Sequence, residues 1–303
     1  SISSLIRYYQ FNRATGTITD RVGLAHADLS GNAIRTSSTA PIPYNTIADG
    51  NWSTNATWNT GQNAPANDWA RVKIENDVTL DQDQTLEHLE ITSAGTLTVD
   101  ESNNLTVGED GLQNDSGSDG IVLKSDATGS ASMIVEGTSS GDITQERYAS
   151  GTYWHYYSSP VAGQAIDDNW MTNNSIVNTP PYQFFRWDED QNYWIIYGST
   201  GNPEAFTDTE FMDGKGYAAT RSADGDVNFT GTVRTGTVNY PATFTSGKGN
   251  GNNLVGNPFT SSIAITEDAQ ATDNFLADNA SILDPNYLAV YIWDEDPGYT
   301  NYR

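Results

Sequence analysis

Hydrophobic positions between residues 49 and 140 fall into very short groups, in which two apolar residues flank one residue of any kind. Side chains alternate between the two faces of a strand, so each group predicts a short strand with one buried face. Turn residues separate the groups. The groups are Val72–Ile74, Val78–Leu80, Leu89–Ile91, Leu97–Val99, Leu105–Val107, Ile121–Leu123 and Met133–Val135.

The spacing of these triplets favours a parallel β-solenoid over residues 49–140. Val72 precedes Leu97 by 25 residues, and Leu97 precedes Ile121 by 24. These distances are close to one coil of a stacked β-helix that has several short strands per turn. An ordinary antiparallel sandwich with short strands is the alternative.

From residue 141 onwards the predicted strands become longer and more aromatic, and turns rich in Gly, Asn and Asp separate them. This pattern is typical of an antiparallel sandwich or a jelly roll. The strands are Ile143–Tyr148, Tyr153–Tyr157, Tyr182–Trp187, Tyr193–Tyr197, Gly216–Thr220, Val227–Val233, Leu254–Gly256 and Tyr287–Trp293. The fold class that we expect is therefore all-β, with very little helix.

One short helix is predicted at Glu267–Ala277, where Thr266 could cap the first turn. Its inward residues would be Ala269, Thr272, Phe275 and Leu276.

The second half of the chain contains an internal duplication. The segment Phe185–Tyr193 returns as Tyr291–Tyr299, and each copy contains Trp-Asp-Glu-Asp. A second matching pair, Tyr157–Val161 and Gly256–Ile263, precedes them. The tryptophans of the two copies are 106 residues apart, which predicts a repeated unit of about 100 residues.

These patterns divide the chain into three parts. Residues 1–48 are expected to be the end of a preceding module and a linker. Residues 49–140 form the solenoid-like segment, and residues 141–303 form the duplicated sandwich-like region. The first copy covers about 150–245 and the second about 250–303, where it is cut short. We therefore expect the chain to be a piece of a longer modular protein.

Charge and composition narrow the possible partners. Thirty-nine acidic residues against fourteen basic ones give a net charge of -25, which disfavours binding to nucleic acid or to anionic membranes. The chain has no cysteine, so thiol catalysis, zinc-thiolate sites and disulfides are excluded. No apolar run reaches 18 residues, so no membrane insertion is expected from this segment. The acidity indicates a solubilising surface, with a role in binding divalent cations as the alternative.

Three acidic segments begin like the loop of an oxygen-ligand calcium site. They comprise Asp188, Asp190 and Asn192; Asp224, Asp226 and Asn228; and Asp294 with Asp296. The sixth position is Tyr193, Phe229 or Tyr299 where such a loop has glycine, and the twelfth position of the first segment is Ser199. Turn formation is the favoured explanation, and structural Ca²⁺ is the alternative; no cofactor is required.

An aromatic run offers a candidate sugar-binding face. Alternation along the strand places Tyr153, His155 and Tyr157 on one face, and Trp154 with Tyr156 on the other. If the first set is exposed, its rings can stack on a glycan. The alternative is that these residues are core.

No catalytic constellation is identifiable, and we expect no enzyme. The acidic residues offer many carboxylate pairs, and nothing singles one out. Gly137–Gly141 matches the Gly-x-Ser-x-Gly pattern of serine hydrolases, but a predicted strand follows it instead of the helix that a nucleophile elbow requires.

Several segments between residues 49 and 303 resemble large secreted proteins of Bacteroidota. They are Gly50–Ser53, Ala56–Trp58, Gly95–Val99, Trp154–Tyr156, Ser158–Val161, Gly214–Tyr217 and Leu254–Pro258. The resemblance implies export by the type IX secretion system and life at the cell surface or outside the cell. It implies adhesin-like proteins or non-catalytic parts of polysaccharide-degrading proteins, and it supplies no catalytic residues.

Together these features predict a non-catalytic structural or adhesive segment of a large secreted or cell-surface bacterial protein. The alternative is a carbohydrate-binding accessory region of a secreted polysaccharide-degrading enzyme. The expected partners are a surface glycan or another surface protein, with the secretion or surface-anchoring machinery as a further alternative. The expected location is extracellular or at the outer cell surface.

Overall fold

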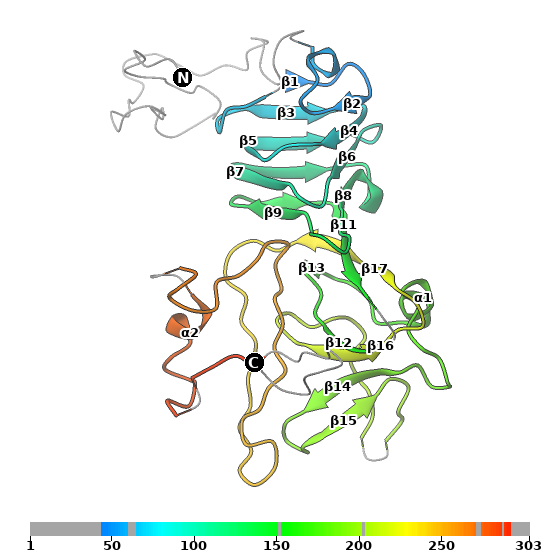
Figure 1. The fold of residues 1–303 in the computed structure, drawn as a ribbon, viewed down its shortest axis with the longest axis vertical. Helices are drawn as coiled ribbons and strands as arrows, with labels where there is room; N and C mark the ends of the chain where they lie inside the picture. Colours follow the sequence, from blue (N-terminus) through cyan, green and yellow to red (C-terminus); the bar gives the residue numbers. More distant parts are fainter. Residues whose placement is uncertain are drawn as a thin grey trace, which may run out of the picture.

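The computed structural model describes residues 44–59, 65–150, 153–201, 204–270, 274–286 and 288–291. Strands account for 40% of it and helices for 7%, which confirms the prediction of a mostly β fold. The molecule is elongated, with a stack of parallel strands at one end and a region of antiparallel strands and long loops at the other (Figure 1).

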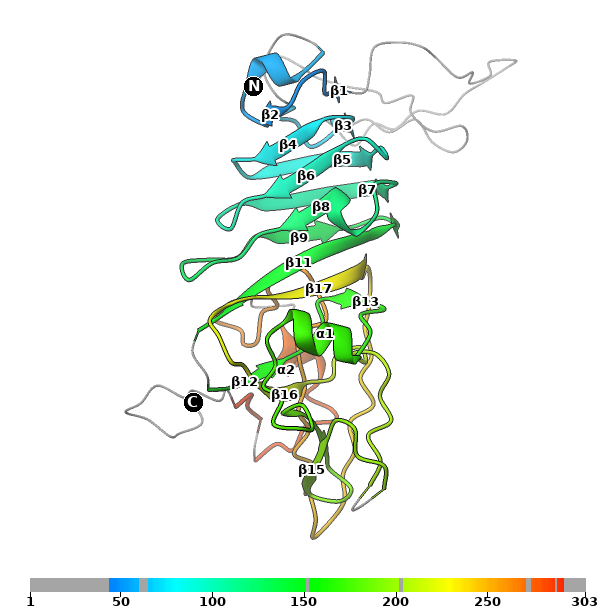
Figure 2. The same cartoon turned by 90° about the vertical axis from the view of Figure 1, so that its right-hand side faces the viewer.

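Two parallel sheets make up the stack, and the chain visits them in turn as it advances (Figure 2). One sheet contains β1 (Tyr44–Asn45), β3 (Arg71–Ile74), β5 (Gln84–Ile91), β7 (Asn104–Asn114), β9 (Ser132–Val135) and β10 (Ser139–Ser140). The parallel part of the other contains β2 (Gly50–Asn51), β4 (Asp77–Leu80), β6 (Thr96–Val99), β8 (Ile121–Leu123) and β11 (Asp142–Ala149).

All seven predicted triplets are strands of this stack. In each, the first and third residues are buried, and the middle residue is partly or fully exposed. Leu97, for example, lies between Val78 and Ile121 in neighbouring parallel strands, and all three belong to the hydrophobic core. Each buried aliphatic side chain contributes about 1.5–3 kcal/mol, so a ladder of such residues holds successive strands in register.

Of the two triplet spacings, one matches the observed strand pairing. Leu97 pairs with Ile121, as the 24-residue spacing predicted. Val72, however, pairs with Leu89, and Leu97 belongs to the other sheet, so the 25-residue spacing from Val72 to Leu97 joins two different sheets. The interval between paired residues varies because the turns between strands differ in length.

Strand β11 joins the stack to the rest of the molecule. It pairs in parallel with β8 on one side, and on the other it pairs antiparallel with β17 (Gly225–Val233), which in turn pairs with β13 (Val161–Ala162). A seven-stranded sheet therefore runs without a break from the stack into the C-terminal region. The boundary predicted at residues 140 and 141 falls just before this strand, where pairing changes from parallel to antiparallel.

A second, fully antiparallel sheet lies beyond the seven-stranded one (Figure 1). Its order is β12 (Trp154–Tyr157), β16 (Tyr217–Thr220), β14 (Phe184–Asp188) and β15 (Tyr193–Ile196). These strands, together with β11 and β17, confirm six of the eight aromatic strands that were predicted after residue 141.

An aromatic cluster connects this second sheet to β17. Trp170 lies on α1 (Asp168–Asn173), where the Asp167 carboxylate caps the helix by accepting the Trp170 N–H at 2.7 Å. The Trp170 ring lies 5.7 Å from Phe184, 4.9 Å from Phe211 and 5.6 Å from Phe229, between ring centroids. This helix was not predicted, because its six residues are too few to show a helical period.

The described residues after β17 contain little regular structure. The predicted strand at Leu254–Gly256 is a single bridge between Lys215 and Val255. The predicted helix at 267–277 is a turn at 267–269, and then α2 (Phe275–Asp278), which Asn274 caps in place of Thr266. The predicted strand at 287–293 is absent from its described residues, 288–291, and the others lie outside the described part.

Two 3-10 turns, η1 (Asn55–Thr57) and η2 (Ser118–Gly120), complete the elements. No helix in the described part of the chain has the length and hydrophobicity needed to cross a membrane.

The second pair of matching segments, Tyr157–Val161 and Gly256–Ile263, meets in space. The Ser158 hydroxyl donates to the Asn257 carbonyl at 2.9 Å. Arg234 donates to the carbonyls of both Ser159 and Pro258 at 3.1 Å. The second Trp-Asp-Glu-Asp copy lies outside the described residues.

Candidate functional site

The two faces of the four-stranded sheet differ in character. The inward face is mostly buried, and its apolar residues include Tyr157, Phe184, Ile195 and Tyr217. The strand register places eight residues on the outward face: Trp154, Tyr156, Phe185, Trp187, Trp194, Ile196, Ala218 and Thr220. We call the five aromatic residues among them, Trp154, Tyr156, Phe185, Trp187 and Trp194, the outer aromatic face.

Rings of the outer aromatic face converge across the sheet. Tyr156 lies on one edge strand and Trp194 on the other, yet their ring centroids are 6.0 Å apart. Trp154 contacts Phe185 edge-on at 5.2 Å, and Trp187 contacts Trp194 in the same manner at 5.3 Å. These contacts form two groups on the same face: Trp154 with Phe185, and Tyr156 with Trp194 and Trp187.

Solvent still reaches this surface. The exposed fraction is 39% for Trp154 and Tyr156, and 38% for Trp194. None of the eight outward residues carries a charge, although the whole chain has a net charge of -25. The face is thus an uncharged aromatic patch on a strongly acidic protein.

The three residues considered for sugar binding, Tyr153, His155 and Tyr157, are not exposed together. Alternation along β12 is confirmed, but it is Tyr157 that points inward, with 8% of its surface exposed. Burial raises the pKa of Tyr157 to about 12. His155 is half-buried, and its ring lies 5.9 Å from the Tyr157 ring. Only Tyr153, which precedes the strand and is 51% exposed, is open to solvent.

The Asp188 to Asn192 segment is a hairpin tip, as the turn explanation predicted. One Asp188 carboxylate oxygen accepts the Gln191 N–H at 2.9 Å, and the other accepts from Arg186 at 3.2 Å. The Asn192 N–H donates to the Asp188 carbonyl at 2.8 Å. Asn192 has a φ of 61°, in the left-handed region that asparagine tolerates. Both Asp188 oxygens are therefore used within the turn.

Glu189 holds a loop that is distant in the sequence against this hairpin tip. The carboxylate of Glu189 accepts the backbone N–H groups of Thr245 at 2.8 Å and Gly251 at 2.7 Å. Its backbone carbonyl accepts from Gly249 at 3.0 Å, where a Cβ on Gly249 would come within 2.5 Å of that same oxygen. Trp187 adds a bond from its indole N–H to the Asn252 carbonyl at 2.7 Å. The segment 245–252, which we call the clasped loop, is thus fixed to the hairpin.

The ionisation of Glu189 follows from this arrangement. Its buried position opposes the charged form, but the N–H donors of Gly251 and Thr245 favour it more strongly. The pKa of Glu189 is therefore lower than its usual 4.5. Asp190 reinforces the contact, because its carboxylate accepts from the Thr245 hydroxyl.

The second acidic segment is a strand and has no loop that could wrap a cation. Asp226 and Asn228 alternate with buried Val227 and Phe229 along β17, and Asp224 lies in the turn before it. The backbone N–H of Asn228 donates to the Asn174 side chain at 2.7 Å. Burial raises the pKa of Asp226, and the nearby Glu146 carboxylate adds to this rise.

The third segment, with Asp294 and Asp296, lies outside the described residues. Within residues 44–291, apart from the gaps, no group of three or more His, Asp or Glu side chains is arranged to hold a metal ion. Structural Ca²⁺ at Asp294 and Asp296 stays a prediction.

Buried cationic side chains act as anchors for the loops around the sheet. Lys215 pairs with Asp208 at 2.5 Å, and Tyr217 donates to the same carboxylate at 2.8 Å. Burial and the charge of Asp208 raise the pKa of Tyr217. Arg234 pairs with Asp213. Arg221 donates to four backbone carbonyls, those of Ala149, Asn174, Gly225 and Asp226.

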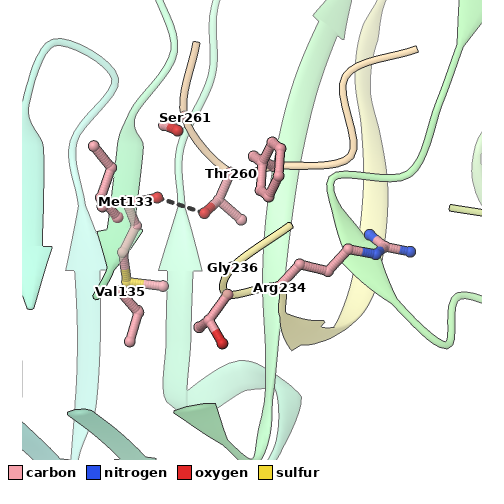
Figure 3. A pocket seen from close by; sticks show the side chains of 9 residues that line it. Met133, Val135, Arg234, Gly236, Thr260 and Ser261 are labelled. Carbon is pink, nitrogen blue, oxygen red and sulfur yellow. Dashed lines mark hydrogen bonds between the residues drawn. The ribbon is translucent and has the colours of Figure 1, made fainter. Parts of the chain in front are cut away.

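A small cavity of about 140 Å³ lies where the 258–261 segment meets the edge of the stack (Figure 3). The Thr260 hydroxyl donates to the Met133 carbonyl at 2.5 Å, and the Met133 N–H donates to the Thr260 carbonyl at 3.2 Å. The guanidinium of Arg234 points away from Met133 and Val135 (Figure 3). The volume is below the roughly 300–1,000 Å³ of ordinary ligand pockets, so this space is a packing gap between two segments.

The sequence interpretation missed the residues that matter most here. Trp154 and Tyr156 were assigned to the other face of their strand, and Trp194 was not considered. Alternation divides a strand into two faces but does not say which one is inward. The role of Glu189 depends on contacts with residues 56 to 62 positions away, for which the sequence has no signal.

Comparison with known proteins identifies a family whose function is unknown. A family model described as "Domain of unknown function (DUF8693)" matches residues 43–302, which is most of the chain, and the chain belongs to this family. No curated protein and no solved structure matches it.

Proposed function

We propose that this member of a family of unknown function is a non-catalytic, stiff segment of a larger secreted or cell-surface protein. In this proposal residues 44–149 form a β-solenoid that serves as a spacer, and the following region is a sandwich-like unit carried at its end. The spacer holds the outer aromatic face at a fixed place, where an external partner can dock.

The observation that carries the proposal is the continuous seven-stranded sheet. Backbone hydrogen bonds join β8 to β11 and β11 to β17, so the stack and the aromatic region share one sheet. The β11 and β17 pairing spans eight residues on each strand, from Asp142 with Thr232 to Ala149 with Gly225. A shared sheet resists bending at the junction, as a spacer requires.

The use of buried cationic side chains also supports a structural role. Lys215, Arg234 and Arg186 pair with Asp208, Asp213 and Asp188, and each pair fixes a loop or a turn. In this proposal the ion pairs fix the conformation of the chain, because each charged group is already paired with its partner.

A location outside the cell follows from the resemblance to type IX-secreted proteins of Bacteroidota. The net charge of -25 fits a solubilising surface in that setting. Adhesion or surface assembly is the role that such a segment would perform.

Surface labelling tests this proposal. An antibody raised against the chain is applied to intact cells of the organism that encodes it, and then to permeabilised cells. We expect intact cells to be labelled, and we expect external protease to remove the label. Labelling that requires permeabilisation would contradict the proposal. A periplasmic marker protein serves as the control for cell integrity.

A further inference from the structure

We propose that the outer aromatic face binds an uncharged polysaccharide by stacking its rings on sugar rings. This inference rests on the proposed function, because it names the partner that the spacer presents. The residues that would make contact are Trp154, Tyr156 and Trp194.

The three contact residues are partly exposed on a sheet whose other face is mostly buried. Trp154, Tyr156 and Trp194 are 38–39% exposed, and they lie on the two edge strands of that sheet. Ala218, the small residue between Tyr156 and Phe185 in the register, is 3% exposed because the larger rings cover it. Tyrosine and tryptophan rings offer apolar contact at little entropic cost, and each carries a polar group.

Charge decides the class of ligand. The eight outward positions carry no charged side chain, while the protein as a whole has a net charge of -25. A polyanion would be repelled by the surrounding field, and a cationic partner would find no carboxylate on the face itself. An uncharged ligand with apolar C–H surfaces and hydroxyl groups fits an uncharged face of Trp and Tyr.

Size argues against a second protein chain. Four strands of four or five residues cover roughly 14 Å by 14 Å, or about 200 Å². A stable protein interface buries about 800 Å² on each partner. The face is therefore too small to hold a folded partner or a second copy by itself, but it can support a short run of sugar units.

The test measures binding of the full chain to polysaccharides by affinity gel electrophoresis. The probes are the neutral polymers β-1,4-xylan, β-1,3-glucan, galactomannan and starch, with alginate as the anionic comparison. We expect retardation by at least one neutral polymer and none by alginate. Retardation by none of the neutral polymers, or by alginate alone, would overturn the proposal.

Paired variants locate the site. Tyr156→Ala with Trp194→Ala should weaken the binding about tenfold or more. Phe244→Ala is the matched control, because Phe244 is a 72% exposed aromatic residue in the loop before the clasped loop. Equal loss in both variants, or no loss in the double variant, contradicts the assignment. Tyr157→Ala is unsuitable, since Tyr157 is buried and its removal would disturb the core.

Oxidative footprinting of the native chain is a second test, which does not depend on whether the double variant folds. Tryptophan oxidation is mapped by mass spectrometry, with and without saturating polymer. We expect Trp154 and Trp194 to be protected. Bound polymer that leaves both residues fully reactive would contradict the proposal.

Self-association is checked by sedimentation. If the native chain is a dimer and the double variant is a monomer, a second copy occupies the face, and the polysaccharide proposal would be wrong. Loss of polysaccharide binding alone leaves surface labelling of cells unaffected, so failure here is distinguishable from failure of the spacer proposal.

Discussion

The stack and the aromatic region are held together by different kinds of contact. In the stack, each strand pairs in parallel with the next strand of its own sheet, and apolar residues that repeat in the sequence lie side by side. In the aromatic region, the decisive contacts join residues far apart in the chain, such as Glu189 with Gly251 and Arg234 with Ser159. A repetitive fold distributes its stability over many similar strands, whereas a non-repetitive one concentrates it in a few residues.

The largest effect is expected from a charge placed inside the stack. Leu97 is fully buried between Val78 and Ile121. Leu97→Asp would leave a carboxylate without a partner in the core, and we expect it to cost about 4–5 kcal/mol or more of unfolding free energy. Thermal and urea unfolding, followed by circular dichroism, measure this loss.

Thr98→Asp is the control for that variant, because Thr98 lies next to Leu97 on the half-exposed face of the same strand. We expect a change of no more than about 0.5 kcal/mol. A stack that tolerates Leu97→Asp as well as Thr98→Asp would refute the inward orientation of the triplets.

The next largest effect is expected at the centre of the aromatic cluster. Trp170 contacts Phe184, Phe211 and Phe229, and its indole N–H donates to the Asn228 carbonyl at 2.9 Å. Trp170→Ala would open a cavity and leave that carbonyl unpaired, at a cost of about 3–5 kcal/mol. Equilibrium unfolding in urea measures it.

Trp154→Ala provides the comparison, because it removes the same side chain from the partly exposed outer aromatic face. We expect this second variant to cost about 1 kcal/mol. Equal costs at the two positions would mean that the aromatic cluster is not the core of this region.

A smaller and pH-dependent effect is expected at Glu189. The lowered pKa of Glu189 means that its charged form stabilises the folded state. This contribution is fully present above the unfolded pKa of 4.5, and it is lost as the pH falls through the lower folded value. Glu189→Gln should lower the melting temperature near neutral pH by less than Trp170→Ala does, and the difference from the native chain should shrink below pH 4.5.

Glu136→Gln, which changes an exposed carboxylate of the stack, is the matched control. If the two variants follow the same pH profile, the clasp by Glu189 does not contribute.

The smallest effect is expected from removal of divalent cations. Both Asp188 oxygens already accept bonds within the hairpin, and Asp226 lies on a strand. We therefore expect the melting temperature to stay unchanged when a chelator is added. The measurement is informative because a cation bound only by the folded state would stabilise it, and its removal would lower the melting temperature. A fall in the melting temperature would instead indicate a bound cation and revive the calcium hypothesis for Asp294 and Asp296.

The sequence predicted the stack well, because its signal is local. Each triplet such as Val78–Leu80 contains its own alternation, and a three-residue strand needs no distant partner to be recognised. The coil length was harder to predict, because it depends on which strands pair. Val72 pairs with Leu89, and no residue near either of them indicates this.

The candidate site could not be predicted for a related reason. Alternation separated Trp154 and Tyr156 from Tyr157 correctly. The inward face, however, is determined by what packs against it, here Trp170 and Phe211, which contact Phe184. The Trp-Asp-Glu-Asp segment was recognised as a hairpin tip, yet its glutamate acts on a loop that is distant in sequence. Long-range contacts leave no periodic pattern.

Hydrogen exchange at the seam between the two regions tests the central claim most directly. If the stack and the aromatic region form one stiff body, backbone amides of β11 and β17 should exchange as slowly as those of β6 and β8, with a common free energy of opening. Peptides covering residues 142–149 and 225–233 report on the seam, and peptides covering 96–99 and 121–123 report on the stack. Fast exchange at the seam, with a protected stack, would contradict the spacer account.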